Sequence, residues 1–190
     1  MTVYQNLRAF RLPEGFRGRS ALVVQAWWLV QSTLFRWSPQ FAYGFRRWLL
    51  RLFGARVGAG VIIRPTVTVT YPWHVSIGDF AWVGDDVCLY SLGRIDIGSN
   101  AVVSQGTYVC AGDHDYSRPD FPIRARSIVV EPEVWIAAEC YLAPGVVVGR
   151  GAVIGARSSV FSAIPAGFVC VGSPARPIKL REMKGASCEY

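Results

Sequence analysis

Aliphatic side chains recur at a spacing of six residues along most of this chain, beginning at residue 57. The series contains only Val, Ile and Leu: Val57, Ile63, Val69, Ile77, Val83, Leu89, Ile97, Val103, Val109, Val130, Ile136, Leu142, Val148, Ile154 and Val160. Six residues form one short strand and a tight corner, and three such sides close a coil around a narrow core. The spacing therefore predicts a parallel β-helix. A β-sandwich would instead alternate with a period of two.

The predicted coils begin at residues 57, 77, 97, 130 and 148, so an insertion interrupts the third coil between about residues 112 and 128. Each coil buries its apolar face only against its neighbours. The expected organisation is an N-terminal helical or amphipathic arm over residues 1–56 and a β-helix over residues 57–164. An active-site loop is expected at about residues 113–128, and a C-terminal turn and tail over residues 165–190.

Length and composition indicate one folded unit with a long core, because the 190 residues are 52% hydrophobic and contain no low-complexity linker. Five cysteines stand at positions 88, 110, 140, 170 and 188, with no CxxC pair. An odd cysteine count, together with the lack of a leader resembling a signal peptide, predicts reduced thiols in a cytoplasmic protein.

Positive charge is concentrated in the arm, where nine arginines accompany a single acidic residue, Glu14. Residues 21–35 are apolar but number only fifteen and include Gln25, Gln31 and Ser32, which is short of the roughly 20 residues that span a bilayer. Residues 41–53 place Phe45, Trp48, Leu49 and Leu52 at helical spacing, with arginines elsewhere on the wheel.

Two interpretations of the arm remain open, and they are compatible with each other. Its helices would cap the first coil, which otherwise exposes unpaired backbone and apolar side chains. They would also suit a peripheral contact with anionic lipids at the inner face of the membrane, since the segment is basic and rich in tryptophan. A nucleic-acid partner is disfavoured, because the arginines alternate with core-sized aliphatic residues and no recognised binding module is present.

The expected chemistry lies at the root of the insertion, in residues 110–116. His114 is one of two histidines in the chain, and a histidine beside a loop that can cover a groove is a candidate general base. Asp113 and Asp115 flank it and would either orient the imidazole or serve as ordinary loop aspartates. A Cys110–His114 acyl-enzyme is disfavoured, because adjacent strand residues point in alternate directions.

No metal site is expected. His74 and His114 are forty residues apart, or two coils of twenty, with Arg94 midway between them. This spacing predicts equivalent corners separated by about 9.5 Å, too far for one ion within a chain. Zinc sites need three or four converging ligands.

Residues 130–176, together with the GDHD motif at 112–115, resemble the hexapeptide-repeat O-acetyltransferases related to the maltose and galactoside acetyltransferases. The most specific motifs are VWIA, LAPGVVVG, VIGA and GSPARPIK. The chain is most similar to the colanic acid biosynthesis acetyltransferases of exopolysaccharide loci, over about residues 20–180. This resemblance implies a left-handed β-helix, a homotrimer, and acetyl-CoA bound in the groove between adjacent prisms.

The resemblance also implies roles for individual residues. His114 would be the general base, and the CoA channel would be lined by Trp135, Ala138, Ala156, Phe161, Ser162, Arg176 and Lys179. Small side chains leave room for the pantetheine arm, and the cations would pair with CoA phosphates. The alternatives are that coil corners need small residues in any case, and that the basic tail is simply solvated.

One departure from the family concerns the acceptor. Simpler sugar acetyltransferases of this superfamily carry an acceptor-binding asparagine where this chain has Gly84-Asp85-Asp86, and Asp86 is a candidate substitute.

The expected activity is acetyl-CoA-dependent O-acetylation of a sugar or glycan hydroxyl in exopolysaccharide biosynthesis. The alternative is a non-catalytic β-helix that acts as a scaffold.

Overall fold

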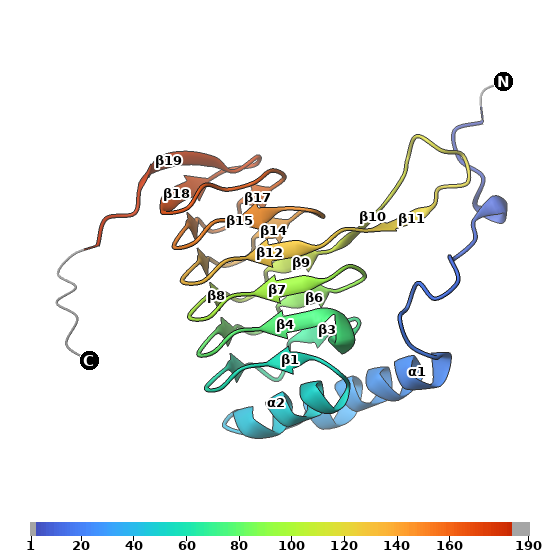
Figure 1. The fold of residues 1–190 in the computed structure, drawn as a ribbon, viewed down its shortest axis with the longest axis horizontal. Helices are drawn as coiled ribbons and strands as arrows, with labels where there is room; N and C mark the ends of the chain where they lie inside the picture. The colour runs from blue at the N-terminus through green and yellow to red at the C-terminus, as the bar shows by residue number, and fades with distance from the viewer. Residues whose placement is uncertain (1–2, 184–190) are drawn as a thin grey trace.

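A parallel β-helix with three sheets forms the body of this protein (Figure 1). The computed structural model describes residues 3–183. Sheet A contains β1 (Arg56–Val57), β4 (Val75–Ile77), β7 (Ile95–Ile97), β12 (Ile128–Val130) and β15 (Val147–Val148). Sheet B contains β2 (Ile62–Ile63), β5 (Trp82–Val83), β8 (Val102–Val103), β13 (Trp135–Ile136), β16 (Val153–Ile154), β18 (Phe168–Val171) and β19 (Arg176–Leu180). Sheet C contains β3 (Thr68–Val69), β6 (Cys88–Tyr90), β9 (Tyr108–Cys110), β14 (Tyr141–Leu142) and β17 (Ser159–Val160).

The hexapeptide positions form the core, as the sequence predicts. All fifteen are buried, and the most exposed of them, Val57, retains 8% of its surface. The strands of successive coils pair in parallel register, with Val57 opposite Ile77 and Val75 opposite Ile95. Across the insertion, Ile97 still pairs with Val130. The predicted parallel β-helix is confirmed, and the insertion leaves its stacking unchanged.

The small residues after the hexapeptide positions are required by close backbone contacts at the corner between sheets A and B. A Cβ atom on Gly98 would lie 2.4 Å from the backbone nitrogen of Pro132 in the next coil. No side chain fits at that distance, so glycine is needed where the coils approach most closely.

Two helical segments cover the first coil and form a cap, defined here as residues 21–53 (Figure 1). The cap contains α1 (Ala21–Val30), a π-helical turn, η2 (Gln31–Phe35), and α2 (Tyr43–Leu52). Trp27 and Phe35 are fully buried in the same core cluster as the coils. The Trp27 indole also donates a hydrogen bond to the carbonyl of Val69, at 2.7 Å. The cap therefore closes the apolar end of the prism.

The arginines of α2 bond to the prism and its Leu49 and Leu50 enter the core, whereas Phe45 and Trp48 face solvent. Arg46 is fully buried and donates to the carbonyl of Ile63 at 2.6 Å, while Arg51 donates to that of Val57 at 2.8 Å. Phe45 and Trp48 stack on each other and are 39% and 54% exposed. The helical spacing suggests an apolar inner face, but the coil edge presents carbonyl groups that need donors. Guanidinium groups supply such donors and accept none.

Arg46→Ala is expected to lower the free energy of unfolding by roughly 3 kcal/mol, because it removes a fully buried side chain and leaves the carbonyl oxygen of the buried Ile63 without this donor. Besides Ile63, the guanidinium bonds to Ser38, Pro39 and Gln40. Chemical denaturation at a fixed protein concentration measures the change. The exposed Arg36 provides the matched control, and Arg36→Ala is expected to stay within about 0.5 kcal/mol of the wild type. Equal effects of the two substitutions would contradict this account of the cap.

Two boundaries differ from the sequence-based expectation. The insertion contains an antiparallel hairpin, β10 (Gly112–His114) and β11 (Ile123–Ala125), rather than an unstructured loop. The β-helix also continues past residue 164, because β18 pairs in parallel with β16 and in antiparallel with β19. Residues 184–190 of the expected tail, including Cys188, lie outside the described residues.

The expectation that His74 and His114 occupy equivalent corners is wrong. In the register of sheet A, Val75 pairs with Ile95 and Ile95 with Ile128. Arg94 therefore corresponds to Ser127 in the next coil, because the chain leaves the prism at Gly112, before it reaches His114. His74 ends the short η3 helix (Pro72–His74), and its Nδ1 lies 3.0 Å from the carbonyl oxygen of Ser91.

Cys88, Cys110, Cys140 and Cys170 are free thiols. Burial raises the pKa of Cys88, Cys140 and Cys170, which keeps these thiols protonated near neutral pH.

Within residues 3–183, no helix is both long enough and apolar enough to cross a lipid bilayer.

Candidate active site

The hairpin β10–β11 projects from the corner between sheets C and A, between β9 and β12 (Figure 1). At its root, the backbone N–H groups of Gly93 and Arg126 both donate to the carbonyl of Ala111, at 2.9 and 3.1 Å. His114 is the last residue of β10 and pairs with Ile123 of β11. The histidine is therefore held by a paired strand that is tied to the rigid coil.

The main-chain carbonyl of Phe121 orients the His114 imidazole, with its oxygen 2.9 Å from Nδ1. The Phe121 ring also stacks on the imidazole, with centroids 4.2 Å apart and planes 9° apart. A carbonyl oxygen can only accept, so Nδ1 carries the proton in the neutral ring and Nε2 keeps its lone pair. Phe121 adopts a left-handed conformation (φ 48°), which is uncommon for a non-glycine residue.

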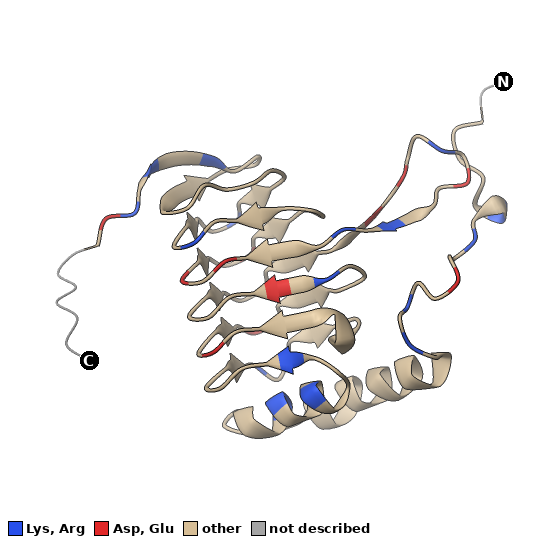
Figure 2. Cartoon of the chain, in the orientation of Figure 1, with Lys and Arg blue, Asp and Glu red and all other residues tan. Residues whose placement is uncertain are grey.

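Asp113 and Asp115 do not orient the imidazole, contrary to one of the two expectations for them. Asp113 forms a bidentate ion pair with Arg124, at 2.9 and 3.0 Å, and lies 3.5 Å from Arg126. Asp115 accepts hydrogen bonds from the hydroxyl and backbone N–H of Ser117, which lower its pKa. The two carboxylates thus stabilise the hairpin, whose charges of both signs are visible in Figure 2.

Cys110 also makes no bond to the histidine. Its thiol donates to the carbonyl of Gly112 at 3.1 Å. Among residues 3–183, no group of three or more His, Cys, Asp or Glu side chains is arranged to hold a metal ion.

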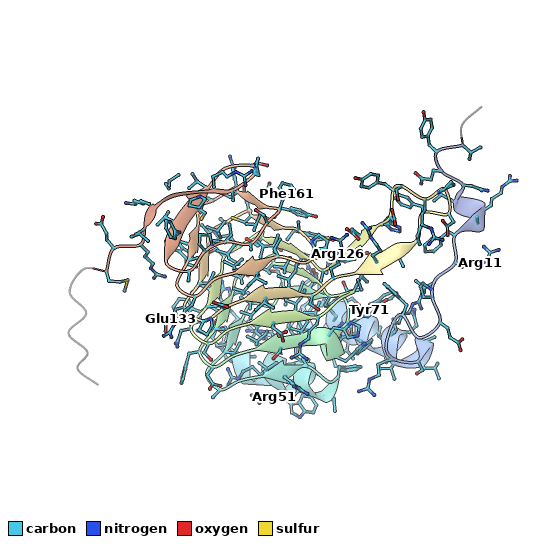
Figure 3. All side chains as sticks on the ribbon, turned by 45° about the horizontal axis from the view of Figure 1, so that its top comes forward. Arg11, Arg51, Tyr71, Arg126, Glu133 and Phe161 are labelled. Carbon is cyan, nitrogen blue, oxygen red and sulfur yellow. The ribbon has the colours of Figure 1, made fainter. Side chains whose placement is uncertain are left out.

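Aromatic side chains form a column along the outer face of sheet C, ending on the same side of the prism as the hairpin. Successive ring centroids are 6.0, 6.2 and 5.8 Å apart along Tyr90, Tyr108, Tyr141 and Phe161. Burial raises the pKa of Tyr141 to about 12, so its hydroxyl stays protonated. Phe161 and the adjacent Ser162 are exposed at the end of this column. Figure 3 shows Phe161 on the hairpin side, together with Arg126.

The remaining residues of the predicted CoA channel lie on a different wall of the prism. Ala138 and Ala156 occupy successive coils at the corner between sheets B and C. The turn from Gly172 to Ala175 stacks on this corner, because Ser159 donates to the Gly172 carbonyl and Ala175 donates to that of Ser159. Arg176 follows the turn, and Trp135 and Lys179 belong to strands of sheet B. Neither Arg176 nor Lys179 pairs with a carboxylate among the described residues.

A groove of about 710 Å³ lies on this second wall and extends over the two coils that precede Ala138. Its lining includes Tyr43, Arg64, Trp82, Asp85, Asp86 and Gln105. Arg64 and Asp85 form an ion pair at 2.8 Å. Asp86 has a left-handed backbone (φ 56°), and its N–H donates a hydrogen bond to the Thr66 hydroxyl oxygen at 2.8 Å. The groove combines aromatic surface with several hydrogen-bonding groups, as sugar-binding sites do.

One chain therefore places the predicted residues on two separate walls. The hairpin wall carries Asp113, His114, Asp115, Phe161 and Ser162. The coil wall carries Asp86, Trp135, Ala138, Ala156, Arg176 and Lys179. Within residues 3–183, the first set lies at the hairpin and the corner between sheets C and A, whereas the second lies on sheet B and at its corner with sheet C.

Sequence reasoning missed the two aromatic residues that contact the imidazole. Phe121 binds the imidazole through its backbone carbonyl, a group that every residue has, so the residue type at this position does not reveal the contact. Phe10 lies in the N-terminal arm, more than a hundred positions before His114, and its ring centroid is 6.1 Å from that of the imidazole. A periodic pattern could not reveal either contact.

Comparisons with known proteins agree with this architecture. The family model described as bacterial transferase hexapeptide (six repeats) matches residues 127–162. The Escherichia coli K12 protein named colanic acid biosynthesis acetyltransferase WcaF is 53% identical over 177 residues, covering 93% of this chain and 97% of that protein.

Two solved structures share the fold. A hexapeptide-repeat acetyltransferase of Vibrio cholerae, complexed with acetyl coenzyme A, has a TM-score of 0.78 at 22% identity, covering 87% of this chain and 92% of that one. A galactoside acetyltransferase in complex with coenzyme A has a TM-score of 0.79 at 23% identity, covering 96% and 92%. With the identity to the Escherichia coli protein over nearly the whole length of both chains, the protein belongs to the hexapeptide-repeat acetyltransferases, in the family of the colanic acid biosynthesis acetyltransferases.

Proposed function

We propose that this protein transfers the acetyl group of acetyl-CoA to a sugar hydroxyl during exopolysaccharide biosynthesis. The relatives named above support the reaction class. The observation in this chain that carries the proposal is the contact between His114 Nδ1 and the Phe121 carbonyl, at 2.9 Å. It leaves Nε2 as a proton acceptor on the half-buried His114, at the end of a hairpin strand that is tied to the coil.

In the proposed mechanism, His114 Nε2 removes the proton from the sugar hydroxyl as its oxygen attacks the thioester carbonyl carbon. The tetrahedral intermediate then collapses, the carbon–sulfur bond breaks, and the imidazolium returns the proton to the departing thiolate. The products are an O-acetyl ester and free CoA. The Phe121 carbonyl stabilises the imidazolium, because the charged ring donates a stronger hydrogen bond through Nδ1.

The complete site is proposed to form between two copies of the chain in a homotrimer. Each copy would contribute its hairpin wall to one groove and its coil wall to the next, which closed cyclic symmetry permits. The coil wall suits a CoA chain, since Ala138 and Ala156 leave room for a thin pantetheine arm. Arg176 and Lys179, exposed at one end of it, would bind the phosphates.

The groove around Asp86 is the proposed acceptor site. The Asp86 carboxylate is exposed and would accept a hydrogen bond from a sugar hydroxyl, in the role that an asparagine has in simpler members of the superfamily. Trp82 is 54% exposed and offers an apolar surface to the C–H face of a sugar ring.

Acetyl transfer measured across free sugars, nucleotide sugars and lipid-linked oligosaccharides tests the proposed reaction. One of these classes is expected to yield an O-acetyl product, with CoA release that depends on the acceptor. CoA should also raise the melting temperature, because it binds the folded state. A protein that neither binds CoA nor acetylates any of the three classes would instead be the non-catalytic scaffold.

The outer surface of the cap is proposed to bind the inner face of the membrane, which would hold the enzyme in the cytoplasm beside a membrane. Its exposed apolar side chains are Leu22, Val23, Trp28, Leu29, Leu34, Trp37, Phe41, Phe45, Trp48 and Leu52. The nine arginines of residues 1–56 make this end of the molecule basic. Apolar side chains combined with positive charge favour anionic lipid surfaces.

The triple variant Leu22→Ser, Leu29→Ser and Trp37→Ser is expected to reduce binding to anionic vesicles at least roughly tenfold, since each apolar side chain contributes to insertion. Sedimentation with phosphatidylglycerol-containing vesicles at low salt measures the bound fraction. These three side chains are 83%, 66% and 82% exposed, whereas Trp27 and Phe35 are in the core. Point substitutions therefore test the surface without the core damage that deletion of residues 1–40 would cause.

The matched control is Leu180→Ser with Met183→Ser, which removes exposed apolar groups at the other end of the prism (61% and 69% exposed). This control should bind vesicles like the wild type. If the wild type did not bind vesicles, or if both variants bound them equally, the cap would have a structural role only.

A further inference from the structure

The N-terminal segment, defined here as residues 4–18, runs from the cap to the catalytic hairpin (Figure 1). At one end, the Trp73 indole donates to the carbonyl of Arg17 at 2.7 Å. At the other end, the N–H of Asn6 donates to the carbonyl of Pro119 in the hairpin loop at 2.6 Å. Between them, Phe16 packs on the buried cluster of Val24, Tyr71 and Leu92. Ile123, the strand partner of His114, packs against the same cluster. The segment is thus attached to both the prism and the hairpin.

Phe10 is the point where this segment meets the proposed catalytic histidine. Among residues 3–18, only Phe10, Phe16 and Arg17 are even partly buried. The Phe10 ring lies 6.1 Å from the imidazole at an interplanar angle of 52°. Its backbone is held in place, because the Arg11 guanidinium donates to the carbonyls of Arg8 and Phe10, at 2.9 and 2.7 Å. These local bonds fix the backbone that carries the ring.

We propose that Phe10, held in place by the N-terminal segment, forms a wall of the acceptor site and determines which acceptor reaches His114. This inference rests on the proposed function, because it assigns the acceptor to the space beside the His114 imidazole. Phe121 covers one face of the ring, and the Phe10 ring lies beside the same imidazole, so an acceptor bound at His114 would lie close to Phe10. The Phe10 ring would pack on the C–H face of a sugar and exclude water from the base. Phe10 would therefore act on acceptor binding and would have little effect on CoA.

Steady-state kinetics of Phe10→Ala, Phe10→Tyr and Leu12→Ala tests this role. Phe10→Ala is expected to raise the KM for the acceptor roughly tenfold, the range expected for one lost apolar contact, with the KM for acetyl-CoA unchanged. CoA release without acceptor should increase, because water gains access to the base. Phe10→Tyr keeps the ring and should restore the acceptor KM. Leu12→Ala removes an exposed apolar residue of the same segment (41% exposed) and should behave as the wild type.

A fall in kcat with an unchanged acceptor KM would assign Phe10 to support of the hairpin and overturn the proposal. A second measurement does not depend on the acceptor. Diethyl pyrocarbonate modifies the unprotonated imidazole nitrogen, so Phe10→Ala should accelerate modification of His114 but not of His74. Equal rates at His114 in the wild type and Phe10→Ala would overturn the proposal, even if the protein proved to have no acetyltransferase activity.

Discussion

His114→Asn is expected to lower kcat by roughly a hundred- to ten-thousandfold, the range found when a general base is removed. Asparagine is similar in size and keeps hydrogen-bonding ability, but it cannot accept and return a proton near neutral pH. Because the imidazole contacts Phe121 and Phe10 but none of the residues of the coil wall, CoA affinity should be unchanged. Acetyl-transfer kinetics combined with CoA titration separates the two effects.

Arg176→Ala is the complementary variant and should show the reverse pattern. It should weaken CoA binding through loss of a phosphate partner, with a smaller effect on turnover at saturating acetyl-CoA. If His114→Asn retained near-native transfer to a verified acceptor, the base would lie elsewhere. The exposed Asp86 would then be the first alternative, because Asp113 and Asp115 are engaged with Arg124 and Ser117.

Two inactive variants are expected to restore activity when they are assembled into one oligomer. His114→Asn removes the base from the hairpin wall, and Ala156→Trp obstructs the coil wall at an exposed corner position. In a one-to-one random mixture, about one quarter of the sites between copies would combine an intact hairpin with an intact coil wall. Co-expression with two different affinity tags, followed by an acetyl-transfer assay, measures the recovered activity.

Ala166→Trp provides the matched control, since it places the same bulk at another exposed corner, outside both walls. It should be active alone. Mixed oligomers of His114→Asn and Ala156→Trp that stay as inactive as the separate variants would show that each chain has its own complete site. A monomer in light scattering at micromolar concentration would exclude the shared groove directly.

The β-helix could be predicted from the sequence because its cause is local and periodic. A coil side of six residues returns an aliphatic side chain to the core at every repeat, so the fifteen buried positions are recognisable from spacing alone. Gly98 is also explained by the local geometry of a coil, since the contact with Pro132 at the corner leaves no room for a side chain. His114 could be identified because it stands in a short motif at the root of an insertion that breaks the period.

Tertiary structure decided the features that depend on distant or main-chain partners. Spacing alone placed His114 at the corner equivalent to His74, but the hairpin carries it away from the coil, because the chain leaves the prism two residues earlier. The arginines of α2 point inward, since the first coil presents carbonyl groups that require donors. Phe121 holds the His114 imidazole through a backbone oxygen, and Phe10 contacts the same imidazole from the N-terminal part of the arm. The residue types alone determined which coils could stack. Only the folded chain determined which groups surround the proposed base, because those contacts join segments that lie far apart in the sequence and outside the six-residue repeat.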